Sequence, residues 1–441
     1  MILARYFLYF VIVATVFTGV TIGGYRHSHK NDPPPPVAVQ YKTPEESDPH
    51  VRFLMEGFDV IQSSYWQKAS DGDLALLYQA SIQKFASSTL SLGTTTDRAS
   101  VAKFVSGGLS SVPDADRTKT VESILGAVLY NMAPIGRNQL LTSSARKDLQ
   151  NEVNNVHPGT NLYDTLGVEN GASAASVQQA YTEKKKELVA STSPVAKQEL
   201  EKVTYAQQVL TATDTKANYD QSRVEPTVFA HLVNPTTLYV YFQKMSPTTE
   251  SEFEDVVRKN VKGSVASMII DLRSNEGGDL TTAQTFLGLF SGPNQYAFDF
   301  YHRGEYKAQR TMGLGAMAEL KKIREIAVLT DGMTQSTAEV VTAAMKRLNL
   351  AASVGTVTRG WGSVEQITPM QTPIDEGGQH AMLLVVELTV CDNAQPIESH
   401  GVLPDVDTTQ KNWQLELPKH FFSKDLIAAI KKQIAKPPQK I

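Results

Sequence analysis

A serine between a short apolar segment and an amphipathic helix is the first residue of this chain that could act as a nucleophile. Residues 326–329 are apolar enough for a buried strand, and apolar side chains recur at helical spacing after Ser336. A hydroxyl at a strand-to-helix turn lies beside free backbone N–H groups and the positive end of a helix dipole. These surroundings suit a nucleophile and its oxyanion.

The same serine also has a purely structural explanation. Ser336 and Glu339 have the S-x-x-E spacing of a capping box, which stabilises the start of a helix without any chemistry. Taken alone, this stretch favours a simple helix start. A catalytic interpretation needs support from elsewhere in the chain.

A glycine pair provides a second feature with chemical potential. Residues 265–272 are almost wholly apolar and predict a covered strand, which ends before Gly277 and Gly278 and a helix over residues 281–290. Two glycines let the backbone approach a ligand and turn its N–H groups toward it. Because such a pair is more often a plain turn, its weight comes from its combination with Ser336.

Composition excludes several classes of function. The 441 residues allow two to four domains, and a net charge of -4 gives no general attraction to nucleic acid, so we expect no nucleic-acid partner. The single cysteine, Cys391, excludes an intrachain disulfide and a cysteine-based zinc site, and its apolar neighbours predict a buried strand. The nine histidines include no H-x-x-x-H pair, so we expect neither a metal nor a cofactor.

The amino-terminal region predicts membrane attachment. Residues 6–25 are uncharged and long enough to span a bilayer, so we predict a transmembrane anchor over residues 1–30. The alternative is a cleavable signal peptide, for which this run is long and lacks an A-x-A site. Basic residues on both sides leave the orientation open. Prolines 33–36 predict a stiff spacer within a linker over residues 31–45.

The middle of the chain predicts two helical parts. Residues 46–156 contain three amphipathic stripes and predict a helical domain. Residues 157–224 resemble the J-domain of DnaJ-type co-chaperones through Tyr163, Leu166, Gly167, Val168, Ala180, Tyr181, Ala206, Val209, Leu210, Tyr219 and Asp220. The family's His-Pro-Asp tripeptide is absent after the second helix, so we expect a spacer or docking module and no stimulation of a chaperone ATPase partner.

Residues 225–415 alternate strands and helices and contain four motifs of one family. The matching residues are Asp271, Leu272, Arg273, Asn275, Gly277 and Gly278; Val328, Leu329, Ser336, Ala338 and Glu339; Val354, Gly355, Thr358, Gly360, Gly362, Ser363 and Val364; and Ile397, Gly401, Pro404 and Asp405. In order and spacing they resemble the carboxyl-terminal processing, or tail-specific, serine peptidases. The resemblance implies an α/β peptidase core of the ClpP/crotonase-like kind, with a parallel-rich sheet and flanking helices, before a helix and tail over residues 416–441.

The resemblance also implies roles for particular residues. It makes Ser336 the nucleophile, and it assigns the oxyanion hole to the N–H of Thr337 and of one of Gly277 and Gly278. Two positions depart from the family: Trp361 stands at its general-base lysine and Glu365 at a glutamine. An indole N–H cannot accept a proton. Lys346 lies too far along the helix, and Glu365, His302 and His400 stay open as bases.

Three functions follow from these matches and departures. The first is a membrane-anchored serine peptidase of the cell envelope that cuts polypeptides on the extracytoplasmic side through Ser336. The second is a pseudopeptidase, in which Trp361 adds an aromatic surface for binding a peptide or partner. The third, a co-chaperone, depends on residues 157–224 alone. The family's peptide-binding PDZ module is missing where those residues stand.

Overall fold

The computed structural model describes most of the chain in three stretches, residues 41–191, 193–390 and 395–438. By their internal contacts the residues divide into two units, 1–42 and 43–441. The predicted anchor, its proline spacer and Cys391 lie outside the described residues. Among the residues that are described, no helix has the length and apolar character needed to cross a bilayer.

The predicted helical amino-terminal region is confirmed. It consists of α1 (Pro49–Ser64), α2 (Asp71–Phe85), α3 (Arg98–Leu109) and α4 (Asp114–Tyr130), followed by β1 (Gln139–Leu141) and α5 (Ser143–Val153). Side chains of Asp48, Ser70 and Asp97 accept hydrogen bonds from backbone N–H groups in the first turns of α1, α2 and α3, as N-caps do. Their apolar faces share one core.

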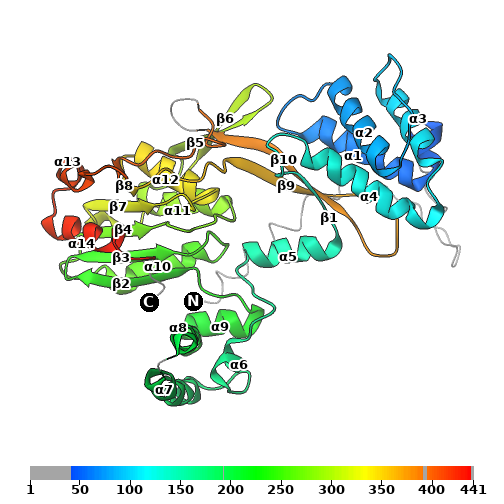
Figure 1. The fold of residues 1–441 in the computed structure, drawn as a ribbon. Coiled ribbons are helices and arrows are strands. Elements are labelled where there is room, and N and C mark those ends of the chain that lie inside the picture. Colours follow the sequence, from blue (N-terminus) through cyan, green and yellow to red (C-terminus); the bar gives the residue numbers. More distant parts are fainter. Residues whose placement is uncertain (1–40, 192, 391–394, 439–441) are drawn as a thin grey trace, which may run out of the picture. The chain divides into compact units, whose positions relative to one another are not determined.

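A long ribbon from the carboxyl-terminal half completes that core. The ribbon is β9 (Ser363–Pro369) paired antiparallel with β10 (Ala381–Val390), and Figure 1 shows it reaching the amino-terminal helices. Met370, Met382 and Leu384 belong to the same buried cluster as α1 to α4. β10 also pairs with β1 and with β5 (Tyr296–His302), which in turn pairs with β6 (Glu305–Arg310). The helical region therefore shares its core with a segment far away in sequence.

Residues 157–224 contain four helices with a core of their own. These are α6 (Leu162–Leu166), α7 (Ala174–Ala190), α8 (Pro194–Thr211) and α9 (Thr213–Ser222). The Tyr219 hydroxyl accepts a hydrogen bond from the Leu162 N–H (2.8 Å), and the Tyr163 hydroxyl donates to Asp220 (2.5 Å). These two bonds hold α6 against α9. The resemblance to a J-domain stays a prediction.

The predicted parallel-rich sheet is confirmed. Its strands run in the order β11 (Val406–Asp407), β8 (Ala352–Gly355), β7 (Glu325–Thr330), β4 (Ser267–Asp271), β3 (Thr237–Phe242) and β2 (Val228–Asn234). All neighbours are parallel except β2 and β3. Because the strands are buried on both faces, β3 and β4 read as continuous apolar runs.

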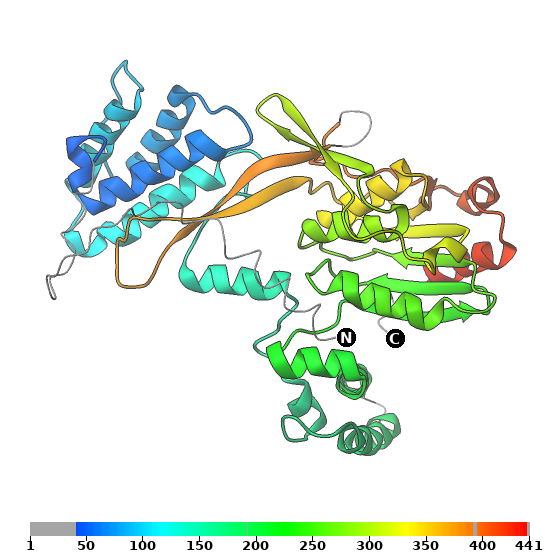
Figure 2. The same ribbon diagram turned by 180° about the vertical axis from the view of Figure 1, so that it is seen from behind.

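Helices cover both faces of this sheet (Figure 2). On one face, α10 (Thr249–Asn260), α11 (Thr281–Ser291) and α12 (Thr337–Arg347) pack against Val240, Ile270 and Val328. On the other, α13 (Leu417–His420) and α14 (Lys424–Ile434) pack against Tyr239 and Ile269. Because β4 and β7 pair in parallel, their carboxyl ends lie side by side.

Candidate functional site

Ser336 lies in a strained turn between β7 and α12. Its φ of 55° and ψ of -128° are unusual for a residue with a side chain, a conformation that costs about 1–3 kcal/mol. The backbone N–H of Ser336 donates to the Glu339 carboxylate (2.9 Å), and the N–H of Gln335 donates to the Asn275 carbonyl (2.9 Å). Bonds from two separate segments therefore hold the turn in place.

Glu339 does more than cap the helix. Its side chain is fully buried and accepts from the N–H groups of Ser336, Gly360 (2.7 Å) and Trp361 (2.7 Å), and from the Thr358 hydroxyl. Burial raises the pKa of Glu339, whereas these donors favour its charged form. The capping box is present, and its glutamate also joins the serine turn to residues 358–361.

Only glycine fits beside the serine turn. A Cβ on Gly277, which has a φ of 82°, would lie 2.6 Å from the Cβ of Ser336. A Cβ on Gly278, with a φ of 140°, would lie 2.1 Å from the Met245 carbonyl oxygen. The glycine pair is therefore required by close packing of β3, β4 and the turn, and it brings the backbone against Ser336.

The two glycines differ in whether their backbone N–H already donates a hydrogen bond. The N–H of Gly277 donates to the Asn275 side-chain oxygen (2.8 Å), so it is occupied. The N–H groups of Gly278 and Thr337 have no hydrogen-bond partner within the described part of the chain. The Thr337 hydroxyl donates to the Gly278 carbonyl (3.0 Å) and so keeps the two segments together. Of the two glycines that the resemblance left open, Gly278 has the available donor.

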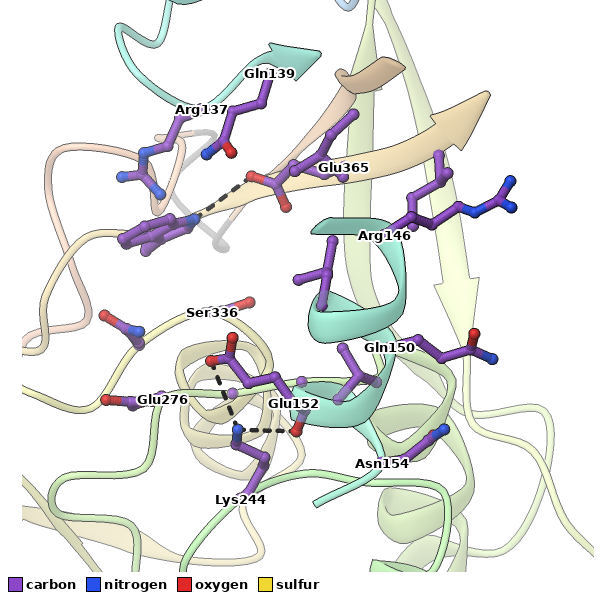
Figure 3. A pocket seen from close by; sticks show the side chains of 18 of the residues that line it. Arg137, Gln139, Arg146, Gln150, Glu152, Asn154, Lys244, Glu276, Ser336 and Glu365 are labelled. Atoms are coloured by element: carbon purple, nitrogen blue, oxygen red, sulfur yellow. Dashed lines mark hydrogen bonds and ion pairs between the residues drawn. The ribbon is translucent and has the colours of Figure 1, made fainter. Parts of the chain in front are cut away.

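Ser336 opens into a cavity of about 740 Å³. Gly277, Gly278, Trp361 and Glu365 line the same cavity, so the structure brings together all the predicted site residues except Thr337, which lines a neighbouring cavity of about 280 Å³ with Ser336. Figure 3 shows side chains that line the larger cavity, Ser336 and Glu365 among them. One wall comes from α5, which lies far away in sequence and contributes Arg146, Leu149, Gln150, Glu152 and Val153.

Lys244 is a cavity residue that sequence reasoning missed. It follows β3, is only 9% exposed, and its ammonium donates to the Glu152 carbonyl (3.0 Å) and lies 3.7 Å from the Glu152 carboxylate. No residue of α5 is buried, and this contact joins the carboxyl-terminal turn of α5 to the segment after β3. The one available signal was a lysine directly after an otherwise apolar strand.

Trp361 stands where the tail-specific peptidases, which this region resembles, have a lysine. The guanidinium carbon of Arg137 lies 3.3 Å from the centre of one of its rings, a cation–π contact. Arg137 also pairs with Glu398 (3.2 Å), which accepts from the N–H groups of Gly362 and Ser363. The indole and the guanidinium therefore close this side of the cavity, and neither can accept a proton.

The structure also shows which of the other candidate bases line the Ser336 cavity. Lys346 pairs with Asp405 (3.1 Å), and His302 Nδ1 lies 2.7 Å from the Val386 carbonyl oxygen. His400 lines a different cavity, together with Lys346. As far as the described residues go, none of these three lines the cavity of Ser336. Glu365 does, and it accepts from the Ser363 hydroxyl (2.6 Å) and the Trp361 indole N–H (3.4 Å).

The sequence profile of Peptidase family S41 matches residues 236–408. This segment holds β3, β4, β7, β8 and β11 of the parallel sheet and every residue discussed at the serine turn. Residues 236–408 belong to peptidase family S41. We call them the S41 region.

Similar proteins carry carboxy-terminal processing names. The carboxy-terminal processing protease CtpB of Bacillus subtilis is 26% identical over 175 residues, which are 40% of this chain and 34% of the relative. A probable CtpA-like serine protease of Staphylococcus saprophyticus is 29% identical over 122 residues, 28% of this chain and 24% of the relative. The chain thus spans about a third or less of the length of these curated relatives.

Solved structures resemble the chain over more of its length. A photosystem II D1 C-terminal processing protease covers 81% of this chain and 92% of its own, with 11% identity and a TM-score of 0.47. A lipoprotein from Streptococcus agalactiae covers 87% of this chain and 98% of its own, with 13% identity and a TM-score of 0.44.

Two charged residues of the S41 region hold the fold together. Asp271 is fully buried and accepts from the Arg273 guanidinium (2.6 Å) and the Tyr239 hydroxyl (2.7 Å). Arg273 also donates to the Lys436 carbonyl beyond α14 (2.8 Å). Because each charge is paired and hydrogen-bonded, both can be buried at the end of β4. Their place in the D-L-R segment is explained by structure.

A separate trio of side chains has the composition of metal ligands. Atoms of Glu122, Asp375 and His380 lie within 4.8 Å of one another, where the loop between β9 and β10 meets α4. His380 Nε2 lies 2.8 Å from a Glu122 oxygen, so a hydrogen bond already accounts for this pair. The expectation of no metal stays a prediction.

Proposed function

We propose that the S41 region binds a polypeptide in the Ser336 cavity and that Ser336 attacks a peptide carbonyl carbon there. The N–H groups of Gly278 and Thr337 receive the oxyanion that forms. One observation carries this proposal: among the described residues, the N–H groups of Gly278 and Thr337 have no hydrogen-bond partner, and they flank a serine held in a strained turn. A helix start alone explains the Thr337 N–H but not the Gly278 N–H.

Cleavage by the full-length protein tests the proposal. We expect it to cut unfolded proteins or peptides with extended carboxyl-terminal tails. Ser336→Ala should abolish cutting and lower the free energy of unfolding by only about 1 kcal/mol, the usual cost of losing a helix cap. The reason is that the hydroxyl supplies the bond-forming oxygen and little packing. Mass spectrometry of the fragments is the measurement. Cleavage that persists at the wild-type rate in Ser336→Ala would contradict the proposal.

A binding protein without catalysis is the second candidate. It is favoured by the stacking of Arg137 on Trp361, because a cation and an indole fill the place of the missing lysine and offer a flat surface for a peptide. This candidate predicts that peptides bind equally to wild type and Ser336→Ala without being cut, and that Trp361→Ala weakens binding. Calorimetric titration with a tailed peptide separates it from the first candidate.

Two further proposals concern the amino-terminal residues and the module of residues 157–224. We propose that the predicted anchor over residues 1–30 tethers the protein to a membrane, with the S41 region on the extracytoplasmic side. The module of residues 157–224 then serves as a docking surface or spacer. Neither proposal alters the chemistry of the site.

A further inference from the structure

Glu365 lies on the S41 strand that faces the serine turn. Side chains two apart on a strand share a face, so β9 presents Ser363 and Glu365 together. Both line the smaller cavity with Ser336 and Thr337, and Glu365 also lines the larger one. Within the described residues, Glu365 is the one carboxylic acid common to the two cavities that Ser336 opens into.

The hydrogen bonds leave half of this carboxylate available. The Ser363 hydroxyl and the Trp361 indole N–H both donate to Oε1. No hydrogen bond within the described part of the chain engages Oε2. Figure 3 shows the Glu365 side chain across the pocket from Lys244. Two donors thus fix the orientation of the group, and one oxygen can still accept a proton.

The two departures from the family pattern compensate each other chemically. A lysine and a glutamine are replaced by Trp361 and Glu365, so the group that can titrate has moved four residues along the chain. Resting on the proposed function, we propose that Glu365 is the proton acceptor for Ser336, directly or through one water molecule. Trp361 is then a positioning residue, which orients Glu365 through its N–H.

Each proton in this reaction has a stated path. The Ser336 O–H bond breaks as Oγ bonds to the peptide carbonyl carbon, and the proton passes to Glu365 Oε2. The glutamic acid then gives the proton to the leaving nitrogen as the C–N bond breaks. In the second half a water molecule gives its proton to Glu365 and attacks the ester, and Glu365 returns the proton to Ser336 Oγ. No metal or redox partner is required.

The surroundings of Glu365 suit this role. Burial raises the pKa of Glu365 above the ordinary value of 4.5, with a smaller contribution from Glu398, whereas Arg137 and the two hydrogen bonds lower it. A base with a raised pKa holds a proton more readily near neutral pH. Among the described residues, the other charged side chains that line the two cavities are Arg146 and Glu152 on α5, Lys244 after β3, and Glu276 and Asp279 before α11.

The pH profile of Ser336-dependent cleavage tests the inference. In the wild type, kcat/KM should fall as pH drops through a value above 4.5, because the base must be ionised. Glu365→Gln should lower kcat about 100-fold or more and remove this acidic limb. A raised pKa means that ionised Glu365 opposes folding at neutral pH, so the amide should not lower the unfolding midpoint.

Two further variants make the test decisive. Glu387→Gln removes another carboxyl group whose pKa burial raises, on β10 outside the cavity, and should keep the wild-type rate and profile. Trp361→Lys combined with Glu365→Gln restores the family pair and should move the limb to alkaline pH. If Glu365→Gln keeps the wild-type rate and profile while Ser336→Ala is inactive, this inference is wrong and the proposed function stands. If no cleavage depends on Ser336, both are wrong.

Discussion

Replacing Glu339 with glutamine is expected to abolish cleavage and to lower the free energy of unfolding by about 3 kcal/mol. Four donors point at the two oxygens of this buried side chain. An amide has one oxygen and an NH₂ group, so at least one backbone N–H would face another donor. The serine turn and residues 358–361 would then separate, because Glu339 joins them.

A matched variant separates loss of the site from loss of stability. Glu252 is a partly buried carboxylate whose pKa is also raised by burial, and it accepts from the N–H groups of Thr227 and Val228 at the start of β2. Glu252→Gln should lower stability in urea unfolding by a comparable amount, yet leave the reactivity of Ser336 in the folded protein intact. Equal activity in Glu339→Gln and wild type would show that Glu339 is only a helix cap.

Adding one methyl group at Gly278 is expected to have the largest effect on folding. Its Cβ would lie 2.1 Å from the Met245 carbonyl oxygen, so β3 and the glycine segment would have to separate. The bond from the Asp279 N–H to that same oxygen (2.7 Å) would be lost as well. We expect Gly278→Ala to lower the free energy of unfolding by more than about 4 kcal/mol, or to prevent folding.

Gly263→Ala is the control for this variant. Gly263 also has a positive φ, of 58°, but a Cβ there would meet nothing within 4 Å. It should therefore cost only about 1 kcal/mol of backbone strain. Denaturant unfolding of both variants compares strain alone with strain plus a clash. Similar small losses in the two would contradict the close approach of Gly278 to Met245.

Local patterns in the sequence were sufficient for the parallel sheet and the serine turn. The apolar runs that predict β4 and β7 are continuous because both faces are covered, and Ser336 follows β7 after the turn of residues 331–335. Gly277, Gly278 and Ser336 could be paired because parallel strands end at the same edge of a sheet. The four family motifs all lie between Asp271 and Asp405 and so describe one compact core.

The rest of the site depends on contacts between distant segments. Arg137 and Lys244 have no motif around them, yet one stacks on Trp361 and the other attaches α5 beside the cavity. In the sequence a capping box explains Glu339, whereas in the structure its carboxylate also accepts from Thr358, Gly360 and Trp361. No local pattern predicts such contacts, because each joins residues that lie nineteen or more positions apart in the sequence.

The most direct test of the account is covalent labelling of Ser336 in the full-length protein. A fluorophosphonate probe reports an activated serine hydroxyl with an oxyanion site, whatever its base. We predict labelling at Ser336 in the wild type and in Glu387→Gln, slower labelling in Glu365→Gln, and none in Ser336→Ala. Peptide mapping would locate the adduct. A folded wild-type protein in which Ser336 stays unlabelled would contradict the claim that this turn is a working acyl-transfer site.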